Sequence, residues 1–334
     1  MTKIDSDSAI QLRNKRWENN KYIPKWVNIK EVGLDHFCTR PDVAKKCWEK
    51  LRKYLEKEKI VQSEYTFIEP SAGLGAFYTL LPKNRRIGID VVKSNPEFIQ
   101  QDFLSWIPEE KKKYICIGNP PFGYRAWLAL AFVNHAGKFS DYIAFIVPMA
   151  FQSNGKSNVK NRIKNFHLIH QSSLPPDSFV DIEEKTVKVN ALFQIWKKGS
   201  IIKKAEKTCD EYIDLFTVDM RKERKCGHKR LHEADFFLQR TFYTNPPQLV
   251  KNFDEVKYVC GYGIIIRKEK EKVLNILQNA DWTRYSNLAS HNCRHISMEH
   301  IRKALITEGF VDKEARSRND VQKVLSVYTN NTED

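Results

Sequence analysis

Short apolar runs that alternate with helical patterns fill the first part of the chain, and this alternation constrains the fold most. Strands separated by helices favour a mostly parallel sheet, because each parallel pair needs a crossover connection. One helical stripe has apolar residues at 43, 44, 47, 48, 51 and 55. The expected strands are Tyr65–Glu69, Arg86–Asp90, Tyr114–Gly118, Tyr142–Val147, His167–Gln171 and Val187–Trp196, and the expected helices are Asp42–Leu55, Arg125–His135 and Asn158–Ile163.

The pattern changes near residue 200, where charged clusters, isolated aromatic residues and short strands such as Tyr262–Arg267 begin. Further on, Ser297 precedes an amphipathic run that ends at Gly309, which predicts a capped helix. We therefore expect an N-terminal extension (1–35), a doubly wound, Rossmann-like α/β domain (36–198) and a smaller C-terminal α+β region (199–334).

Composition limits the class of protein. With 41% hydrophobic and 29% charged residues in 334, the chain can bury a sizeable core. The longest apolar run, Tyr142–Phe151, is interrupted by Pro148 and is far shorter than the roughly 20 residues that a membrane-spanning helix needs. The N-terminal residues show no apolar core of a signal peptide, and the 7 cysteines are an odd number. We expect a cytoplasmic protein with reduced thiols and no membrane partner.

The net charge of +15 fits a polyanionic partner, because lysine and arginine side chains that neutralise phosphates release counterions. Nucleic acid is the natural candidate, although an ordinary basic protein carries a similar charge. Trp17 and Trp26 lie among lysine and arginine residues and suit either stacking on nucleic acid or packing on the main domain.

A glycine-containing turn follows the first expected strand. It runs from Glu69 to Gly75 and leads into an apolar run that we expect to be helical. Glycines at 73 and 75 let the backbone approach a ligand closely. The next strand ends at Asp90, where a carboxylate can accept hydrogen bonds from ribose hydroxyls. Tyr78 occupies the place of the third glycine of a dinucleotide-binding fold, which argues against NAD.

A third acidic residue, Asp102, comes where another strand should end. Its carboxylate is suited to accept from an adenine amino group while Phe103 packs on the ring. Together with the glycine turn, these residues favour a nucleoside ligand without phosphates, of which S-adenosylmethionine is the common one. Strand-end aspartates also occur as plain loop chemistry.

The tetrapeptide Asn119-Pro120-Pro121-Phe122 follows an apolar strand and precedes a helical pattern. An exocyclic amine on a heteroaromatic ring is a poor nucleophile because its lone pair is delocalised. The Asn119 side-chain carbonyl and a backbone carbonyl, each accepting one N–H, would expose that lone pair to a sulfonium methyl group. The prolines add rigidity, and Phe122 offers a stacking face for a flipped base.

A second copy of the tripeptide provides an internal comparison. Asn245-Pro246-Pro247 is followed by Gln248 in place of the aromatic residue, and no apolar strand precedes it. We interpret this copy as a plain turn.

With these motifs the chain resembles the class I S-adenosylmethionine-dependent N6-adenine methyltransferases over about residues 36–198. The segment Phe37-Cys38-Thr39-Arg40-Pro41 is similar to the family's N-terminal motif, although Arg40 separates Thr39 from the proline. The resemblance implies that Thr39 helps to hold the methionine carboxylate. It implies a cofactor site of Thr39, Glu69, Ser71, Gly73, Gly75, Asp90, Val91, Asp102, Phe103 and Asn119.

The resemblance also implies that Asn119, Pro120, Pro121 and Phe122 are catalytic, and that an aromatic residue of the later strand completes the base pocket. Phe193 and Trp196 are the candidates. Alternation along a strand places them on opposite faces, so only one should line the pocket, and we favour Trp196.

The order of the motifs resembles the gamma arrangement of DNA adenine methyltransferases. It implies methylation of adenine N6 in double-stranded DNA after base flipping, with residues 199–334 recognising the target. Adenosine in RNA, a glutamine amide in a protein, and a silent nucleic-acid-binding protein stay open as alternatives. The sequence leaves open whether a restriction nuclease is a partner and which oligomeric state forms.

Two clusters invite a zinc interpretation. One holds Cys226, His228 and His232, and the other extends from His291 through Cys293 and His295 to His300. Neither has the spacing of a zinc motif with a matching partner set, so no metal is expected.

Overall fold

The computed structural model describes residues 37–123, 126–152, 159–181, 184–199, 207–221, 226–289 and 292–312. The extension 1–35 with Trp17 and Trp26 lies outside these residues, as do Arg125, Asn158 and His291. The chain divides into two compact units, 1–201 and 202–334. Among the described residues, no helix is both long enough and apolar enough to cross a membrane.

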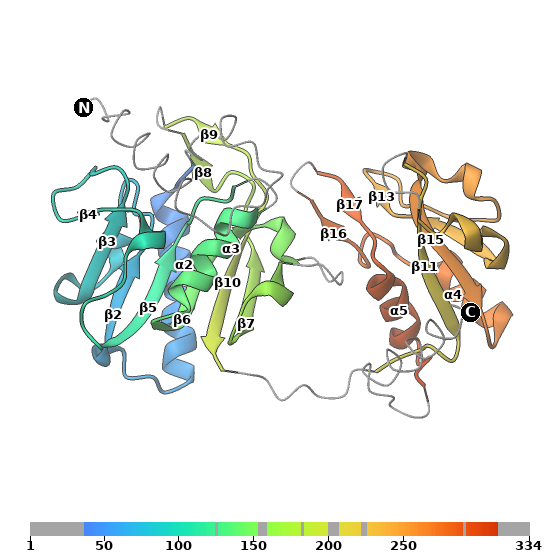
Figure 1. The fold of residues 1–334 in the computed structure, drawn as a ribbon, viewed down its shortest axis with the longest axis horizontal. Helices are drawn as coiled ribbons and strands as arrows, with labels where there is room; N and C mark the ends of the chain where they lie inside the picture. The colour runs from blue at the N-terminus through green and yellow to red at the C-terminus, as the bar shows by residue number, and fades with distance from the viewer. Residues whose placement is uncertain are drawn as a thin grey trace, which may run out of the picture. The chain divides into compact units, whose positions relative to one another are not determined.

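A seven-stranded sheet organises the first unit (Figure 1). Its order is β4 (Ile99–Gln100), β3 (Arg86–Asp90), β2 (Tyr65–Glu69), β5 (Lys113–Gly118), β6 (Ser140–Pro148), β10 (Ala191–Lys198) and β7 (Phe166–Ser173). The strands β4 to β6 pair in parallel, and β10 pairs antiparallel with both neighbours. Numbered along the chain, the first five strands run 3-2-1-4-5, the doubly wound order. The expected Rossmann-like α/β fold is therefore confirmed.

The helix α2 (Pro41–Lys57) covers one face of this sheet (Figure 1). Pro41 stands at its first position, where the missing N–H costs nothing. Its buried residues are the six of the predicted stripe: Val43, Ala44, Cys47, Trp48, Leu51 and Leu55. They pack on alternate residues of the central strands, including Phe67, Ile117 and Ile146. The second helix, α3 (Trp127–Ala136), contacts β6.

Most other connections are single 3-10 turns, and here two predictions were wrong. The apolar run after the glycine turn forms only the turn Tyr78–Leu80, because Pro82 disfavours a helical conformation at Leu81. The run expected as a helix to Ile163 forms the turn Lys160–Arg162. So short a segment cannot offset the cost of helix nucleation. The remaining 3-10 turns are Gln62–Glu64, Lys83–Arg85, Phe103–Ser105, Met149–Gln152, His228–Glu233, Phe253–Glu255 and Lys257–Val259.

A small antiparallel sheet forms from segments distant in the sequence. It contains β1 (Cys38–Thr39), β8 (Phe179–Val180) and β9 (Thr186–Val187). Thr39 pairs with Phe179, and Phe179 pairs with Val187. The run Val187–Trp196, expected as one strand, is thus divided between this sheet and β10.

The second unit is α+β, as expected. Its larger sheet has the order β11 (Ile213–Asp219), β15 (Cys260–Ile266), β12 (Phe236–Gln239) and β14 (Leu249–Val250), and a smaller sheet has β13 (Thr241–Phe242), β17 (Arg294–His295) and β16 (Asn287–Leu288). The helices α4 (Lys270–Gln278) and α5 (Met298–Thr307) contact each other. The largest buried side chain of their shared core is Trp282.

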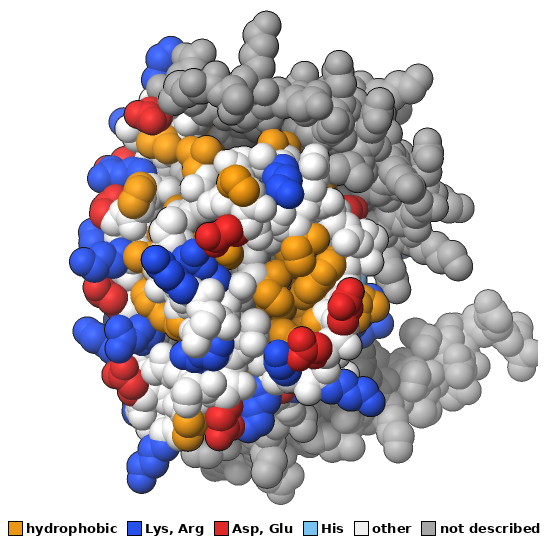
Figure 2. All heavy atoms as spheres, turned by 90° about the vertical axis from the view of Figure 1, so that its left-hand side faces the viewer, with side chains coloured by type: hydrophobic (Ala, Val, Ile, Leu, Met, Phe, Trp, Pro, Cys, Tyr) orange, Lys and Arg blue, Asp and Glu red, His pale blue; other side chains and the backbone are white. Residues whose placement is uncertain are grey.

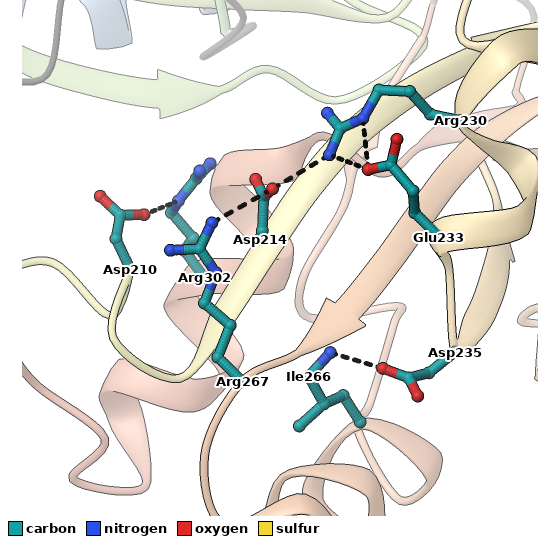
Figure 3. Close-up of polar contacts among 8 residues, drawn as sticks. All are labelled: Asp210, Asp214, Arg230, Glu233, Asp235, Ile266, Arg267 and Arg302. Atoms are coloured by element: carbon teal, nitrogen blue, oxygen red, sulfur yellow. Dashed lines mark hydrogen bonds and ion pairs between the residues drawn. The ribbon is translucent and has the colours of Figure 1, made fainter. Parts of the chain in front are cut away.

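Ion pairs join the elements of the second unit (Figure 3). The Asp214 carboxylate on β11 accepts from Arg230 at 3.1 Å and contacts Arg267 at 3.3 Å. Arg230 also contacts Glu233 at 2.7 Å and lies over the Phe216 ring. These guanidinium groups therefore hold the strands and the turn 228–233 together.

Surface charge in the first unit is mixed. Figure 2 shows its left-hand side in Figure 1, where Lys and Arg side chains alternate with Asp and Glu around apolar side chains. The excess of positive charge is therefore not gathered on the described part of this face.

The predicted cap of α5 is confirmed and can be tested. The Ser297 hydroxyl accepts from the His300 backbone N–H at 3.3 Å. We expect Ser297→Ala to lower the free energy of unfolding by about 1 kcal/mol. Urea denaturation measures this, with the exposed Ser63→Ala as control, which should change it by less than about 0.5 kcal/mol. An equal effect of both substitutions would contradict the capping role.

Candidate functional site

The glycine turn at the carboxyl end of β2 has room on its outer side. Gly73 has φ +50° and Gly75 has φ +79°, both in the left-handed region. A Cβ on Gly73 would meet nothing within 4 Å, whereas one on Gly75 would lie 3.4 Å from the Phe98 ring. The backbone at Gly73 is therefore open to a ligand, whereas glycine is favoured at 75 by its left-handed φ, since a Cβ there would make only an ordinary van der Waals contact.

Asp90, at the end of β3, is hydrogen bonded to this turn. Its Oδ2 accepts from the Gly73 N–H at 2.7 Å, and its Oδ1 accepts from the Val92 N–H at 2.9 Å. Each carboxylate oxygen has a second lone pair. Asp90 is thus fixed beside the open face of Gly73. Val91 follows it and is half-buried.

The buried Glu69 side chain stabilises the backbone that follows the glycine turn. Its side chain is 2% exposed, and Oε2 accepts from the Tyr78 N–H at 2.6 Å. Burial raises the pKa of Glu69 well above its usual value, against the backbone N–H groups of Tyr78 and Phe77, which lower it. A direct contact of Glu69 with a cofactor stays a prediction.

Asp102 caps the 3-10 turn after β4. Its carboxylate accepts from the Leu104 N–H at 3.0 Å, and the side chain is buried. The Phe103 ring is only 1% exposed and packs among Trp106, Phe132 and His135. The prediction that this ring stacks on an adenine is wrong, because the aromatic cluster already covers it.

Asn119 lies directly after the end of β5, next to the glycine turn. The Ser71 hydroxyl donates to the Asn119 backbone carbonyl at 3.0 Å, which joins the two loops. The Asn119 Nδ2 donates to the Phe37 carbonyl at 3.0 Å. Its Oδ1 is buried and accepts from no described residue. The amide is therefore held in one orientation, with a strong acceptor left unused.

Three aromatic rings contact one another: Phe37, whose carbonyl binds the Asn119 amide, Phe122 and Phe179. Phe122 is half-buried, and its ring centroid lies 6.4 Å from that of Phe179 at an interplanar angle of 87°. The Phe37 ring centroid also lies 6.5 Å from that of Phe179, at an interplanar angle of 56°. Sequence reasoning missed Phe179. The only signal in the sequence was an isolated aromatic residue in a polar segment. The position of Phe179 depends on its pairing with Thr39, which is distant in the sequence.

Thr39 is itself buried on β1, and its hydroxyl has no partner among the described residues. Burial, then Asp90 and Asp181, raise the pKa of the neighbouring Cys38 thiol. The Cys38 thiol thus lies near Asp90, and the next residue along β1 carries an unused hydroxyl.

Neither later-strand aromatic residue lines this pocket, which corrects our preference for Trp196. Trp196 pairs with Ile143, and Ile143 pairs with Cys116. Trp196 is therefore level with the middle of β5, whereas Asn119 follows the carboxyl end of that strand. It is 3% exposed, and its Nε1 donates to Gln194. Phe193 does lie on the opposite face, as alternation predicts, but it is completely buried in the core under α2.

Metal ligands do not gather in the part of the chain that the structure describes: no three His, Cys, Asp or Glu side chains come together there. Cys293 and His295 are neighbours, with Sγ 3.6 Å from Nε2, and the other His295 nitrogen contacts Thr241. Cys226 is exposed.

No family model and no curated protein matches the chain. Among solved structures, the magnesium protoporphyrin IX methyltransferase of Synechocystis PCC 6803, solved with bound SAM, shares 13% identity and has a TM-score of 0.35, covering 58% of this chain and 98% of that one.

Two further structures are similar at the same level. The 23S rRNA methyltransferase ErmE shares 12% identity and has a TM-score of 0.35, covering 51% of this chain and 73% of that one. The M protein of the type I restriction enzyme EcoKI shares 14% identity and has a TM-score of 0.30, covering 41% and 40%. The order of the strands carries the assignment of the fold.

The buried Glu69 carboxyl predicts a pH dependence of stability. Because its folded-state pKa is raised, the stability it contributes is complete below the unfolded pKa, about 4.3, and is lost as pH rises through the folded pKa. Glu69→Gln stays neutral and keeps an acceptor for Tyr78. We expect the free energy of unfolding of E69Q, relative to wild type, to increase as pH rises from 4 to about 8, in urea titrations.

The control for this experiment is Glu109→Gln, which removes an exposed carboxylate. Its stability should follow that of the wild type across the same pH range. A difference between E69Q and wild type that stays constant with pH would show that burial of Glu69 does not destabilise its charged form.

Proposed function

We propose that this chain transfers a methyl group from S-adenosylmethionine to the N6 amine of adenine in DNA. The observation that carries the proposal is the Asn119 amide: Nδ2 is committed to the Phe37 carbonyl, and Oδ1 is buried and unused. A buried acceptor without a donor is costly unless a ligand supplies one. An exocyclic amino group is such a donor.

The residues of the first unit fit the cofactor. Gly73 leaves open space at the turn, Asp90 can accept from the ribose hydroxyls, and Asp102 can accept from the adenine amino group. The unused hydroxyl of Thr39 is available for the methionine carboxylate. When bound, the cofactor supplies an electrophilic methyl group on a sulfonium sulfur.

The chain's own residues then orient the acceptor. Asn119 Oδ1 accepts one N–H of the amine, and a backbone carbonyl of the Asn119–Pro120 segment accepts the other, which draws the nitrogen lone pair out of the ring. Proline at 120 and 121 fixes the segment and adds no competing N–H. Phe122 stacks on the base. The amine nitrogen forms its bond to the methyl carbon as the bond to sulfur breaks, and the extra proton leaves to water.

DNA as acceptor rests on the net charge of +15 and on the separate α+β unit of the chain. Both features suit a partner that is large and negatively charged. Specific recognition would come from base contacts of the second unit, and positioning from its phosphate contacts.

Substitution of the central amide tests the chemistry. Asn119→Ala removes the acceptor without touching the Gly73 turn or Asp90. We expect the single-turnover rate of methyl transfer to fall at least about 100-fold, with S-adenosylmethionine affinity changed less than about three-fold. Quenched-flow assays with labelled cofactor and isothermal calorimetry measure the two quantities.

The matched control is Asn245→Ala, which alters the second Asn-Pro-Pro copy. Asn245 is exposed and lies on a loop after the two-residue strand β13, not at the end of a long buried strand such as β5. Its single-turnover rate at saturating DNA should equal that of wild type. A near-normal single-turnover rate for N119A would show that Asn119 is not required for methyl transfer.

Digestion of the product identifies the acceptor. After incubation with tritiated S-adenosylmethionine and a mixture of unmethylated DNA, RNA and protein, we expect DNase to release the label and RNase and protease to leave it. Label released by RNase would instead identify adenosine in RNA as the acceptor, and label released by protease would identify a glutamine amide.

A further inference from the structure

The described part of the second unit exposes four large apolar side chains, and all four lie at one end of its main sheet. They are Met220, Tyr243, Tyr258 and Val259, exposed by 37%, 55%, 59% and 46%. Asp219 at the end of β11 pairs with Cys260 at the start of β15, and Gln239 at the end of β12 pairs with Gly261. The segments that follow or precede these strands therefore meet. We call the four side chains the tyrosine patch.

Direct contacts make this patch continuous. The Tyr243 and Tyr258 ring centroids lie 6.5 Å apart at an interplanar angle of 62°. The Met220 N–H donates to the Val259 carbonyl at 2.9 Å. The patch is thus built from three segments that lie side by side, joined by one ring contact and one backbone hydrogen bond.

The backbone under the patch is strained. Tyr258 has φ 63° and ψ 15°, and Val259 has φ 47°. A β-branched residue in the left-handed region is an outlier, and such conformations collect at functional sites. In this conformation the Tyr258 ring and the Val259 side chain are exposed to solvent, so neither is stabilised by burial in the core.

Charges of both signs lie beside the patch. Lys257 precedes Tyr258 and is exposed, and Arg221 follows Met220. Among the carboxylates, Asp219 is 3% exposed and bonded to Arg221, whereas Asp254 and Glu255 in the preceding turn are exposed. Flat rings flanked by exposed cations match nucleic acid, which offers planar bases and phosphates together.

We infer that the tyrosine patch inserts against the bases of DNA, with the rings stacking on base faces and Val259 and Met220 acting as the apolar part of the wedge. The inference rests on the proposed function and adds the surface by which the second unit holds its substrate. Lys257 would contact the adjacent phosphate.

Fluorescence anisotropy of the full-length protein with a labelled, unmethylated duplex of about 30 base pairs tests this. We expect Tyr258→Ala to weaken DNA binding about five- to 100-fold, with an unchanged salt slope, because stacking and not a phosphate contact is lost. Tyr258→Phe should keep the affinity. Lys257→Ala should reduce the salt slope by about one. The control, Val61→Ala, removes a side chain equally exposed, at 55%, in the other unit.

A second variant separates binding from folding. Asparagine tolerates the left-handed region better than tyrosine. Tyr258→Asn should therefore melt no lower than wild type and still bind DNA about as weakly as Tyr258→Ala. Loss of affinity in a fully stable protein supports the patch.

Unchanged DNA affinity of both Tyr258→Ala and Tyr258→Asn would overturn the inference. So would loss of self-association in sedimentation velocity with DNA affinity retained, which would make the patch a contact between copies of the chain. A wild-type protein that transfers no methyl group to DNA, yet loses DNA affinity on Tyr258→Ala, would support the patch and overturn only the proposed methyltransferase function.

Discussion

One hydrogen bond, from Asn119 Nδ2 to the Phe37 carbonyl, gives the site its chemical character. It joins residues 82 apart and decides which end of the amide is available. Without this bond the amide could rotate and turn its NH2 group, a donor, toward the substrate amine. The amine instead needs the amide oxygen as an acceptor. Everything proposed for the base depends on this orientation. The small sheet of β1, β8 and β9 makes it possible, because that sheet places the segment after residue 36 beside the end of β5.

The rest of the site consists of loops that support one another. The Ser71 hydroxyl holds the Asn119 carbonyl, Gly73 holds Asp90, and buried Glu69 holds the backbone at Tyr78. These bonds fix the loops although the connection after the glycine turn is only a 3-10 turn and not a longer helix. A site fixed in this way needs little reorganisation when its ligands bind.

Local sequence patterns predicted what depends on local sequence. Tyr65–Glu69 and Arg86–Asp90 form strands with the expected limits, and the stripe of α2 is buried as its spacing requires. Register between distant segments could not be read in this way. Trp196 was misplaced because its height in the sheet depends on pairing with Ile143, and Phe179 was missed because its neighbours Phe37 and Phe122 come from distant loops. The buried environment of Phe103 likewise depends on α3.

The central claim is that the site delivers a methyl group to one particular nitrogen of a nucleobase. The most direct measurement is mass spectrometry of nucleosides from unmethylated DNA after incubation with this protein and S-adenosylmethionine carrying a deuterated methyl group. The account predicts N6-trideuteromethyl-2′-deoxyadenosine as the labelled nucleoside. Label at a carbon atom of cytosine, or in no nucleoside while the cofactor is bound, would contradict it.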